Sequence, residues 1–482
     1  MIHSKRTKIV ATVGPACSDP KVLLAMINAG VNVFRINFSH GTHEDHGKII
    51  DAIHKINKEN QRTIAILADL QGPKIRVGKI ENNAANLEPG ATFTITTNET
   101  LGNDNIASIT YQELPRDVSV GERILLDDGK IELVVKDTND KDTIHTEVVY
   151  GGILSSNKGV NLPNTRISQP SLTVKDEKDL KYALSKEVHW IALSFVRSAT
   201  DVYELKRKIK KTGSLAKVIS KIEKPEAIKD IDNIVEESDA IMVARGDLGV
   251  EVPMEEIPTL QKDIVAKCVR AARPVIIATQ MMENMISNAR PTRAEVTDVA
   301  TAVSEGSDAV MLSGETSVGK YPVKVIETMT KIINEVELDE SNYMHADGYN
   351  KWNNGPNPES PAFLAGAICF NAVKISDSVD ARAVIGITQA GYTAHKLSSF
   401  RPKSKVFIFS GNKFLIHQLS LVWGVTSLFY DRDVTTSETF ADMHHVLKTR
   451  NHVKSGDVLI NTASMPFLAK ARTNMLKISI VE

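Results

Sequence analysis

The stretch that decides the fold runs from Lys217 to Leu248 and reads KVISKIEKPEAIKDIDNIVEESDAIMVARGDL. It opens with a short run of β-branched apolar residues, which favours a buried strand. Pro225 then suits the first turn of a helix, and residues 240–244 are apolar again before Gly246. The order strand, helix, strand predicts a parallel strand pair joined by a right-handed crossover.

Charged residues stand at the carboxyl ends of both predicted strands. Lys221 and Glu223 are two positions apart and share a face, and Asp247 follows the next strand. In parallel α/β folds the active residues gather at these strand ends. Two carboxylates with a lysine between them predict a Mg²⁺ and phosphate site, because hard cations prefer oxygen ligands. A Lys–Glu ion pair at a barrel rim explains the same spacing equally well.

Composition is average for soluble globular proteins. The 482 residues exceed one ordinary core, so about two to four domains are expected. The net charge is −1, and the one dense basic run, 206–211, has a helical pattern typical of a solvated face, so we expect no nucleic acid. The three scattered cysteines predict no disulfide framework and favour a reducing cytoplasm. No apolar run approaches the roughly 20 residues that span a bilayer, so no membrane association is expected.

Eight short apolar runs predict the strands of a (β/α)₈ barrel. Most intervals between them carry a helical pattern. For example, Thr292 and Glu295 form a capping box ahead of an apolar stripe. The spacing is that of βα units, except for one long gap after the third run. The predicted strands are 8–13, 32–37, 63–70, 189–195, 217–222, 240–244, 274–279 and 309–313.

The long gap and the carboxyl-terminal part predict two further domains. Residues 74–168 alternate apolar and polar positions between turn signals, which indicates a small inserted β-barrel domain acting as a lid. Residues 344–482 alternate strands and helices again, which predicts an open α/β sheet. The expected architecture is therefore α/β, with a catalytic barrel built from residues 1–73 and 169–343.

Polar residues also follow the second and third predicted strands. Arg35, Asn37 and Ser39 alternate on one face of the second, where inward-facing polar groups need partners. Asp69 ends the third and would face the same barrel mouth. A structural polar network is the alternative for the first three residues, and a hinge with a surface ion pair is the alternative for Asp69.

Hydroxyl groups end the last two predicted strands. Thr279 follows the seventh and Ser313 the eighth. Taken singly, each is more typical of a helix cap or a turn. Because all these polar residues share one face of one predicted barrel, together they indicate an active site.

The sequence resembles pyruvate kinase over essentially its whole length. The motifs that carry the resemblance are TKIVATVGPA (7–16), NVFRINFSHGTHE (32–44), KGVNLP (158–163), ISKIEKPEAI (219–228), IMVARGDLGVEVP (241–253), VIIATQMMENMI (275–286), RPTRAEVTDVATAV (290–303) and MLSGETSVGKYP (311–322). Their length, their order and the place of the insertion make the resemblance specific. It implies a cytoplasmic homotetramer that transfers the phosphoryl group of phosphoenolpyruvate to ADP, giving ATP and pyruvate in the last step of glycolysis. It also implies that the domain of residues 344–482 serves effector binding or oligomerisation.

The resemblance assigns the phosphoenolpyruvate site residue by residue. It implies that Glu223 and Asp247 bind Mg²⁺ or Mn²⁺. Lys221 and Arg35 would contact the migrating phosphoryl group. The main-chain N–H groups around Gly246 and Asp247, at a helix start, would receive the substrate carboxylate.

Five more residues take roles from the same resemblance. Thr279, with Ser313 nearby, belongs to the region from which the enolate is protonated. His40, Arg76 and the lid residue Lys158 match positions near the nucleotide phosphates. A mobile lid carrying Lys158 would keep the site dry during phosphoryl transfer.

The chain departs from many family members at the monovalent-cation position. Those members bind K⁺ with residues matching Asn37, Ser39 and Asp69 and with the carbonyl of Leu70. They carry Glu where this chain has Lys74, and that replacement resembles the K⁺-independent branch. A tethered ammonium could take the place of the free cation and offset Asp69. We therefore expect that activity does not require K⁺.

The effector loops also depart from the family pattern. Members activated by a sugar bisphosphate carry a Ser/Thr-rich loop and a later Gly-rich loop. Here the first reads TQAGYT (388–393), which could cradle a phosphate, and the second reads ASMPFLAK (463–470), which has no glycine. The sequence thus disfavours fructose 1,6-bisphosphate. Another phosphorylated effector, or none, stays open.

Two other functions fit part of the pattern. A Mg²⁺-dependent barrel lyase acting on an enolate would use Lys221, Glu223 and Asp247 but would need no nucleotide site, whereas Arg76 and Lys158 suggest one. A catalytically silent effector-binding protein belongs to a different class, and the intact polar set argues against it. ADP-dependent pyruvate release separates the lyase from the kinase, and turnover itself separates both from the silent protein.

Overall fold

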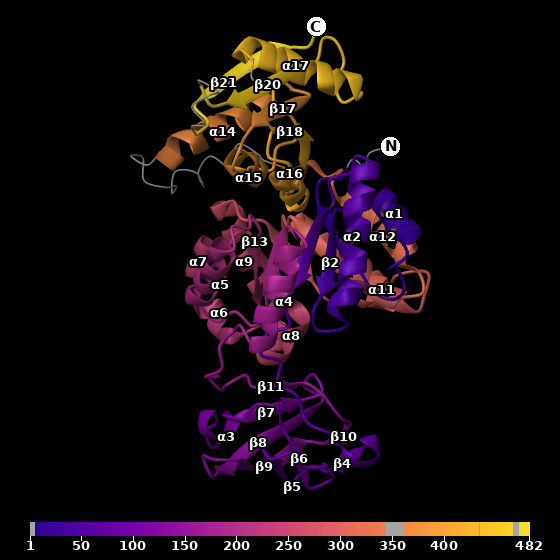
Figure 1. Cartoon of the computed structure of the whole chain (residues 1–482), viewed down its shortest axis with the longest axis vertical. Helices are drawn as coiled ribbons and strands as arrows, with labels where there is room; N and C mark the ends of the chain where they lie inside the picture. Colours follow the sequence, from indigo (N-terminus) through magenta and orange to yellow (C-terminus); the bar gives the residue numbers. More distant parts are fainter. Residues whose placement is uncertain (1–4, 344–360, 433, 466–471) are drawn as a thin grey trace.

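The computed structural model describes residues 5–343, 361–432, 434–465 and 472–482. Three domains follow one another along the long axis: an all-β insert, a barrel and a carboxyl-terminal α/β domain (Figure 1). The expected boundary at residue 344 and residues 466–470 of the expected effector loop lie outside the described residues. None of the described helices is long and apolar enough to cross a membrane.

Eight parallel strands close into a barrel, which confirms the predicted fold class. The interior is filled by buried side chains such as Leu67, Trp190 and Met242, so polar groups of the strands emerge at their ends. The strands are β1 (Lys8–Thr12), β2 (Val33–Asn37), β3 (Ala65–Asp69), β12 (Trp190–Leu193), β13 (Lys217–Ile222), β14 (Ala240–Ala244), β15 (Val275–Ala278) and β16 (Ala309–Leu312). Their order around the ring is β1-β16-β15-β14-β13-β12-β3-β2.

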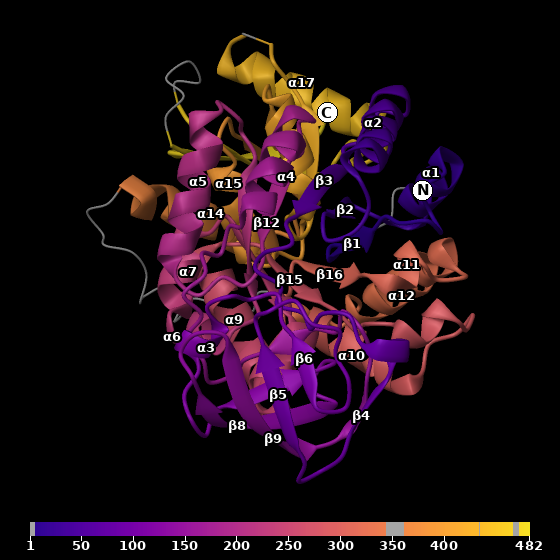
Figure 2. The ribbon, with the colours of Figure 1, turned by 60° about the horizontal axis from the view of Figure 1, so that its bottom comes forward.

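Helices surround the strands of the barrel (Figure 2). They are α1 (Pro20–Ala29), α2 (His43–Glu59), α4 (Val174–Ser185), α5 (Ala199–Lys211), α6 (Pro225–Lys229), α7 (Ile231–Glu237), α8 (Arg245–Glu251), α9 (Ile257–Ala271), α10 (Arg293–Ser304), α11 (Gly314–Ser317) and α12 (Pro322–Val336). The predicted capping box of α10 is present, with Thr292 and Glu295 exchanging hydrogen bonds. The single helix expected after Pro225 is instead broken at Asp230. The Asp230 carboxylate accepts a hydrogen bond from Ala199 N at the start of α5 (2.9 Å), which favours a break there over a continuous helix.

The insert leaves the barrel after β3 and returns before α4. Its elements are β4 (Ala85–Leu87), β5 (Thr92–Thr96), β6 (Ile106–Ser108), α3 (Leu114–Asp117), β7 (Arg123–Leu126), β8 (Ile131–Thr138), β9 (Thr143–Tyr150), β10 (Gly152–Leu154) and β11 (Val160–Asn161). Six strands form a curled sheet in the order β11-β7-β8-β9-β5-β6, beside the ribbon β10-β4. Phe93, Leu133 and Ile144 belong to its separate buried core. The insert therefore has a hydrophobic core of its own, separate from that of the barrel.

The carboxyl-terminal domain is an open five-stranded sheet with helices. Its elements are α14 (Pro361–Ser378), β17 (Ala383–Ile387), α15 (Tyr392–Ser399), β18 (Lys405–Ser410), α16 (Lys413–Gln418), β19 (Val425–Phe429), α17 (Thr436–Thr449), β20 (Val458–Ala463) and β21 (Met475–Ile480). The strand order is β19-β18-β17-β20-β21, in which β21 alone runs antiparallel to its neighbour.

This domain packs against the amino ends of the barrel strands. Asp308, just before β16, accepts from Arg401 (3.1 Å) and from the main-chain N of Trp423 (3.1 Å). Lys8, which begins β1, donates to the carbonyl of Val425 (2.8 Å). The opposite end of the barrel, where the strands finish, is left to face the insert.

Three histidines meet at the same interface. His189, just before β12, accepts from Ile66 N through Nδ1 (3.0 Å), and its ring centroid lies 4.7 Å from that of His417 on α16 and 6.0 Å from that of His54 on α2. Burial, and then the neighbouring His417 and His54, hold the pKa of His189 well below its ordinary value. Burial also lowers the pKa of His417. The interface therefore favours the neutral imidazoles of His189 and His417.

The histidine cluster makes stability depend on pH. In the unfolded chain these imidazoles bind a proton near pH ~6.5, whereas the folded chain keeps His189 neutral to lower pH. The unfolded state thus binds more protons, and stability falls as pH drops below about 6.5. We expect the melting temperature of the full chain to decrease from about pH 7.5 to about pH 5.5, with a shallower decrease in His189→Asn. The exposed His445→Asn is the control, and equal slopes in all three proteins would contradict the prediction.

Candidate active site

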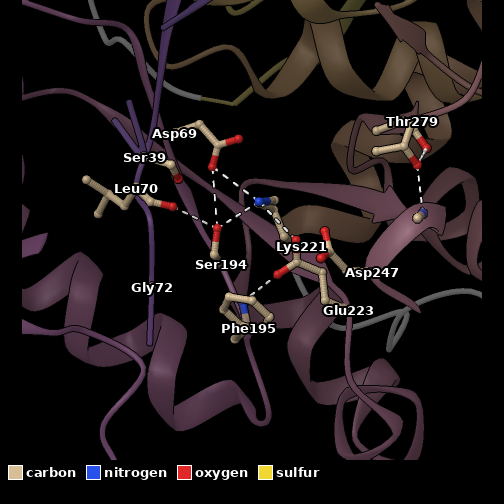
Figure 3. A network of polar contacts seen from close by, with 12 residues as sticks. Ser39, Asp69, Leu70, Gly72, Ser194, Phe195, Lys221, Glu223, Asp247 and Thr279 are labelled. Carbon is tan, nitrogen blue, oxygen red and sulfur yellow. Dashed lines mark hydrogen bonds and ion pairs between the residues drawn. The ribbon is translucent and has the colours of Figure 1, made fainter. Parts of the chain in front are cut away.

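Lys221 lies at the centre of a polar network at the carboxyl ends of β3, β12 and β13 (Figure 3). Its ammonium donates to Ser194 Oγ (2.7 Å) and lies 2.9 Å from Glu223 Oε1 and 3.4 Å from Asp69 Oδ1. Ser194 Oγ in turn donates to the carbonyl of Leu70 (2.7 Å). The structure thus brings together residues that the sequence places more than a hundred positions apart.

Asp69 also holds the second cation of the site. Arg35 Nε donates to Asp69 Oδ2 (2.7 Å), and Arg35 Nη1 donates to Thr12 Oγ1 (2.9 Å). The Asp69 side chain is 1% exposed, and those of Arg35 and Lys221 are each 11% exposed. One buried carboxylate therefore orients an arginine and a lysine toward the barrel mouth.

The charges of this network support one another. Burial by itself would lower the pKa of Lys221, but Asp69 and Glu223 outweigh it and raise that pKa above its ordinary value. For Asp69, burial would raise the pKa, but Lys221 and Arg35 outweigh it and lower that pKa. Asp69 is therefore ionised and Lys221 protonated throughout the physiological range.

Glu223 and Asp247 form the candidate divalent-cation site. Glu223 Oε2 accepts from Phe195 N (2.7 Å), while the buried Oε1 faces the Lys221 ammonium without an aligned hydrogen bond. Burial raises the pKa of Glu223; Lys221 lowers it, and the nearby Asp247 raises it further. Figure 3 shows the Glu223 and Asp247 side chains next to each other. A carboxylate with an unsatisfied oxygen beside a second carboxylate fits Mg²⁺, which takes its other ligands from water and substrate.

The described residues contain no group of three or more His, Cys, Asp or Glu that could hold a metal ion. Two protein carboxylates are compatible with Mg²⁺, which usually keeps several waters and binds through one or two carboxylates plus substrate oxygens. The donor set would not suit a structural zinc site, which needs four protein ligands.

Thr279 links the ends of β15 and β14. Its hydroxyl accepts from Gly246 N (2.7 Å) and donates to the carbonyl of Ala278 (2.6 Å). Its φ of 71° is unusual for a β-branched residue, so the surrounding contacts must hold it there. Arg245 adds to these contacts, donating to the Thr279 carbonyl (2.9 Å) and pairing with Asp298 (2.6 Å).

The other predicted residues lie apart from this network. Ser313 N donates to Glu315 Oε2 (2.7 Å) in the loop after β16. His40 is exposed beyond β2. Arg76 donates to the carbonyl of Asn157 (3.0 Å). Lys158 lies 2.7 Å from Asp127, which raises the pKa of Lys158. Both of these contacts, that of Arg76 and that of Lys158, stay within the insert.

The expected monovalent-cation residues are only partly connected. Asn37 Oδ1 accepts from Ser39 N (3.1 Å), and the Leu70 carbonyl is used by Ser194. We expected the Lys74 ammonium to offset the charge of Asp69, and this expectation is wrong. The ammonium lies 3.9 Å from Asp247 Oδ1, because the chain turns away from β3 before it reaches Lys74.

Two contacts were not found from the sequence. Ser194 directly follows β12, so it carried the same signal as the other hydroxyls at strand ends. Phe195 acts through its main-chain N–H, which no residue pattern reveals. Its φ is 54°, and Gly72 (φ 69°) leaves room for its ring, because an added Cβ at Gly72 would come within 2.9 Å of the Phe195 ring.

Comparison with known proteins agrees with this geometry. The family "pyruvate kinase, barrel domain" matches residues 4–326, and "pyruvate kinase, alpha/beta domain" matches residues 366–479. The chain belongs to the pyruvate kinase family. Pyruvate kinase 2 of Synechocystis sp. is 42% identical over 99% of this chain and 80% of its own length, and the pyruvate kinase of Corynebacterium glutamicum is 40% identical over 99% and 98%.

A solved structure shows the same arrangement of domains. The crystal structure of a pyruvate kinase from Cryptosporidium parvum superimposes with a TM-score of 0.92, at 34% identity, over 99% of this chain and 97% of that one. These comparisons confirm the family and the fold that the sequence motifs predicted.

A buried trio of polar side chains, an ion pair and an asparagine, joins the insert to the barrel of this pyruvate kinase. Lys224, just after β13, lies 2.8 Å from Glu251 Oε1 on α8, and Asn161 of β11 donates to the same oxygen (2.9 Å). Glu251 Oε2 is buried without a hydrogen bond. The Lys224 and Glu251 side chains are 6% and 1% exposed, so the trio sits in a water-poor contact beside the active site.

Removing the cation of this trio is expected to destabilise the protein. Lys224→Met leaves the Glu251 charge buried and unpaired, which costs about 3–5 kcal/mol and lowers the melting temperature in a thermal scan. The double variant Lys224→Met/Glu251→Gln should recover much of this loss, because the amide can still accept from Asn161. A single variant that melts with the wild type would show that the pair contributes nothing.

Proposed function

We propose that this chain transfers the phosphoryl group of phosphoenolpyruvate to ADP, giving ATP and pyruvate, in the last step of glycolysis. The observation that carries the proposal is the buried Asp69 that holds Lys221 and Arg35 as fixed cations at the barrel mouth, in a member of the pyruvate kinase family. Phosphoryl transfer has a loose, charge-rich transition state, so fixed charges stabilise it more than a nucleophile would.

The residues of the network divide between the substrate's groups. Lys221 and Arg35 would contact the phosphoryl group as it moves. The main-chain N–H groups of Gly246 and Asp247 would receive the carboxylate, and that of Gly246 would exchange its bond to Thr279 for the substrate. Asp69 keeps both cations oriented, so binding requires no reorganisation of charge at the moment of transfer.

Glu223 and Asp247 would hold Mg²⁺ or Mn²⁺ beside these groups. When bound, the cation neutralises charge that develops on the phosphate and enolate oxygens. The Thr279 hydroxyl, with Ser313 on the neighbouring loop, would stand where the enolate carbon receives its proton. Thr279 already has both its hydrogen bonds to main chain, which fixes the hydroxyl in place.

The nucleotide would enter between the barrel and the insert. His40 on the barrel side, and Arg76 and Lys158 on the insert, would contact its phosphates. In this structure Lys158 is paired with Asp127 (2.7 Å), so binding ADP would require the ammonium to turn from that carboxylate to the phosphates. Closure of the insert would also exclude water from the transfer.

The central lysine provides the first test. Lys221→Met is expected to lower kcat by at least about 10²-fold, because it removes one preorganised charge-stabilising donor. The assay is ADP-dependent pyruvate release with Mg²⁺ present, and the exposed Lys229→Met is the matched control. Near-native turnover in Lys221→Met would contradict its role. Pyruvate release that needs no ADP would favour the lyase instead.

We also propose that activity does not require K⁺. The position expected for that ion is formed by Asn37, Ser39, Asp69 and the Leu70 carbonyl. Asp69 is already paired with two cationic side chains, and the Lys74 ammonium adds a further fixed charge at Asp247. A free cation would therefore have little unmatched negative charge to bind.

The K⁺ proposal is tested by varying one ion. Turnover in buffer without sodium or potassium should rise less than about tenfold when K⁺ is added. Lys74→Met should respond to K⁺ like the wild type, because Asp69 keeps both of its cationic partners. Stimulation of the wild type beyond that limit would refute the proposal.

Three further proposals rest mainly on family membership. We propose a homotetramer, which is supported by the exposed apolar side chains of Ile478 and Ile480 on the edge strand β21. We propose a cytoplasmic location, which suits the three buried free cysteines. We retain the domain division 1–73 with 169–343, 74–168 and 344–482.

A further inference from the structure

A basic pocket lies far from the active site, beside the amino ends of the carboxyl-terminal sheet. It opens next to β17, β18 and β20, close to the first residues of the chain, and has a volume of about 780 Å³. Small-molecule pockets commonly measure about 300–1,000 Å³. The domain that carries it stands at the opposite end of the molecule from the insert in Figure 1. We call this cavity the basic pocket, because its lining includes Arg6, Arg382, Lys403, Lys405, His452 and Lys454.

Four separate segments bring positive charge to this pocket. They precede β1, β17, β18 and β20, so only the tertiary fold assembles them. Five arginines and lysines line the cavity against three aspartates, Asp377, Asp380 and Asp457, which leaves a net charge of +2. Such an excess within one concave surface attracts small anions.

The cations of the pocket differ in whether they have an acidic partner. Lys403 pairs with Glu340 (2.8 Å). No ion pair involves Arg382, Lys405 or Lys454 anywhere in the part of the chain that the structure describes. Arg382 Nε makes only a long contact to the carbonyl of His452 (3.4 Å). Their remaining N–H donors are therefore available to a ligand.

The electrostatics of the pocket agree with this geometry. Burial, then Arg382 and then Arg6, lower the pKa of Lys405. Burial, then Lys405, Arg450 and Arg382, lower that of His452. No carboxylate contributes to either shift, so these groups experience an uncompensated positive field that a bound anion would relieve.

Arg6 connects the pocket to the interface between the barrel and the carboxyl-terminal domain. Its guanidinium donates to the carbonyls of Pro402 and Lys403 and stacks over Tyr343 (4.1 Å to the ring centroid). It is thus held in place before any ligand arrives, which lowers the entropy cost of binding. An anion in the pocket would contact groups that follow the amino terminus and groups of the far domain together.

We propose that the basic pocket binds a small phosphorylated metabolite, with its phosphate between Arg382 and Lys405. Guanidinium and ammonium groups form strong charge-assisted bonds with phosphate oxygens. Asp377 and Asp380, which line the same pocket, would accept hydrogen bonds from hydroxyl groups on the same ligand. This site is distinct from the loop 388–393, which follows the carboxyl end of β17.

Calorimetric titration of the full chain tests the proposal, first with inorganic phosphate and then with a hexose monophosphate. Arg382→Met and Lys405→Met, both outside the catalytic network, should each weaken the hexose monophosphate affinity by at least about tenfold, the loss expected for one charge-assisted contact. Two controls should bind like the wild type: Lys331→Met, which removes an exposed lysine elsewhere, and Thr388→Ala, which alters the loop at the other end of β17.

Each alternative gives a different pattern. Loss in Thr388→Ala with full binding in the pocket variants would place the phosphate in the loop 388–393 and overturn the proposal. Equal weakening in Lys331→Met would show diffuse attraction rather than a site. No measurable binding of either probe to the wild type would also overturn it. Two independent pocket variants at exposed side chains guard against a folding defect in one, and their melting temperatures without ligand should match the wild type.

Discussion

The active site depends on one buried carboxylate shared between two cations. Asp69 is almost fully removed from water, and such a charge is tolerated only when it is paired. Here Arg35 on the neighbouring strand β2 and Lys221 on β13, two strands away, pair with it. The ion pairs offset the cost of burying the carboxylate and of fixing the cations. The result is a pair of cations fixed in place without any ligand, which under the proposed function would stabilise a charge-rich transition state.

The two ends of the barrel contact different domains. At the amino ends of the strands, Asp308 and Lys8 anchor the carboxyl-terminal domain through buried polar contacts. At the carboxyl ends, the functional side chains face an insert with its own core, held by a few contacts such as that of Asn161 with Glu251. Under the proposed function, an insert with a core of its own would close over the strand ends without disturbing the strands.

The basic pocket fits the same division of the molecule. It lies where the barrel meets the carboxyl-terminal domain, whose main-chain carbonyls hold Arg6 in place. A ligand there would add contacts across a junction already built from charged groups. Its influence on the distant active site would have to pass through the barrel strands that begin at this junction.

Much of this protein was determined by local sequence. The apolar runs of the barrel, the capping box at Thr292 and the charged residues of the stretch from Lys217 to Leu248 follow from periodicity and position, because strands and helices impose fixed spacings on buried residues. Tertiary structure decided which hydrogen-bond and ion-pair partners these residues have. Neither the Phe195 N–H bound to Glu223, nor the place of Lys74 beside Asp247, has a residue pattern, since each depends on how a turn directs the chain after its strand ends. Distant segments meet only when the barrel closes, and that closure fixes which charge faces which.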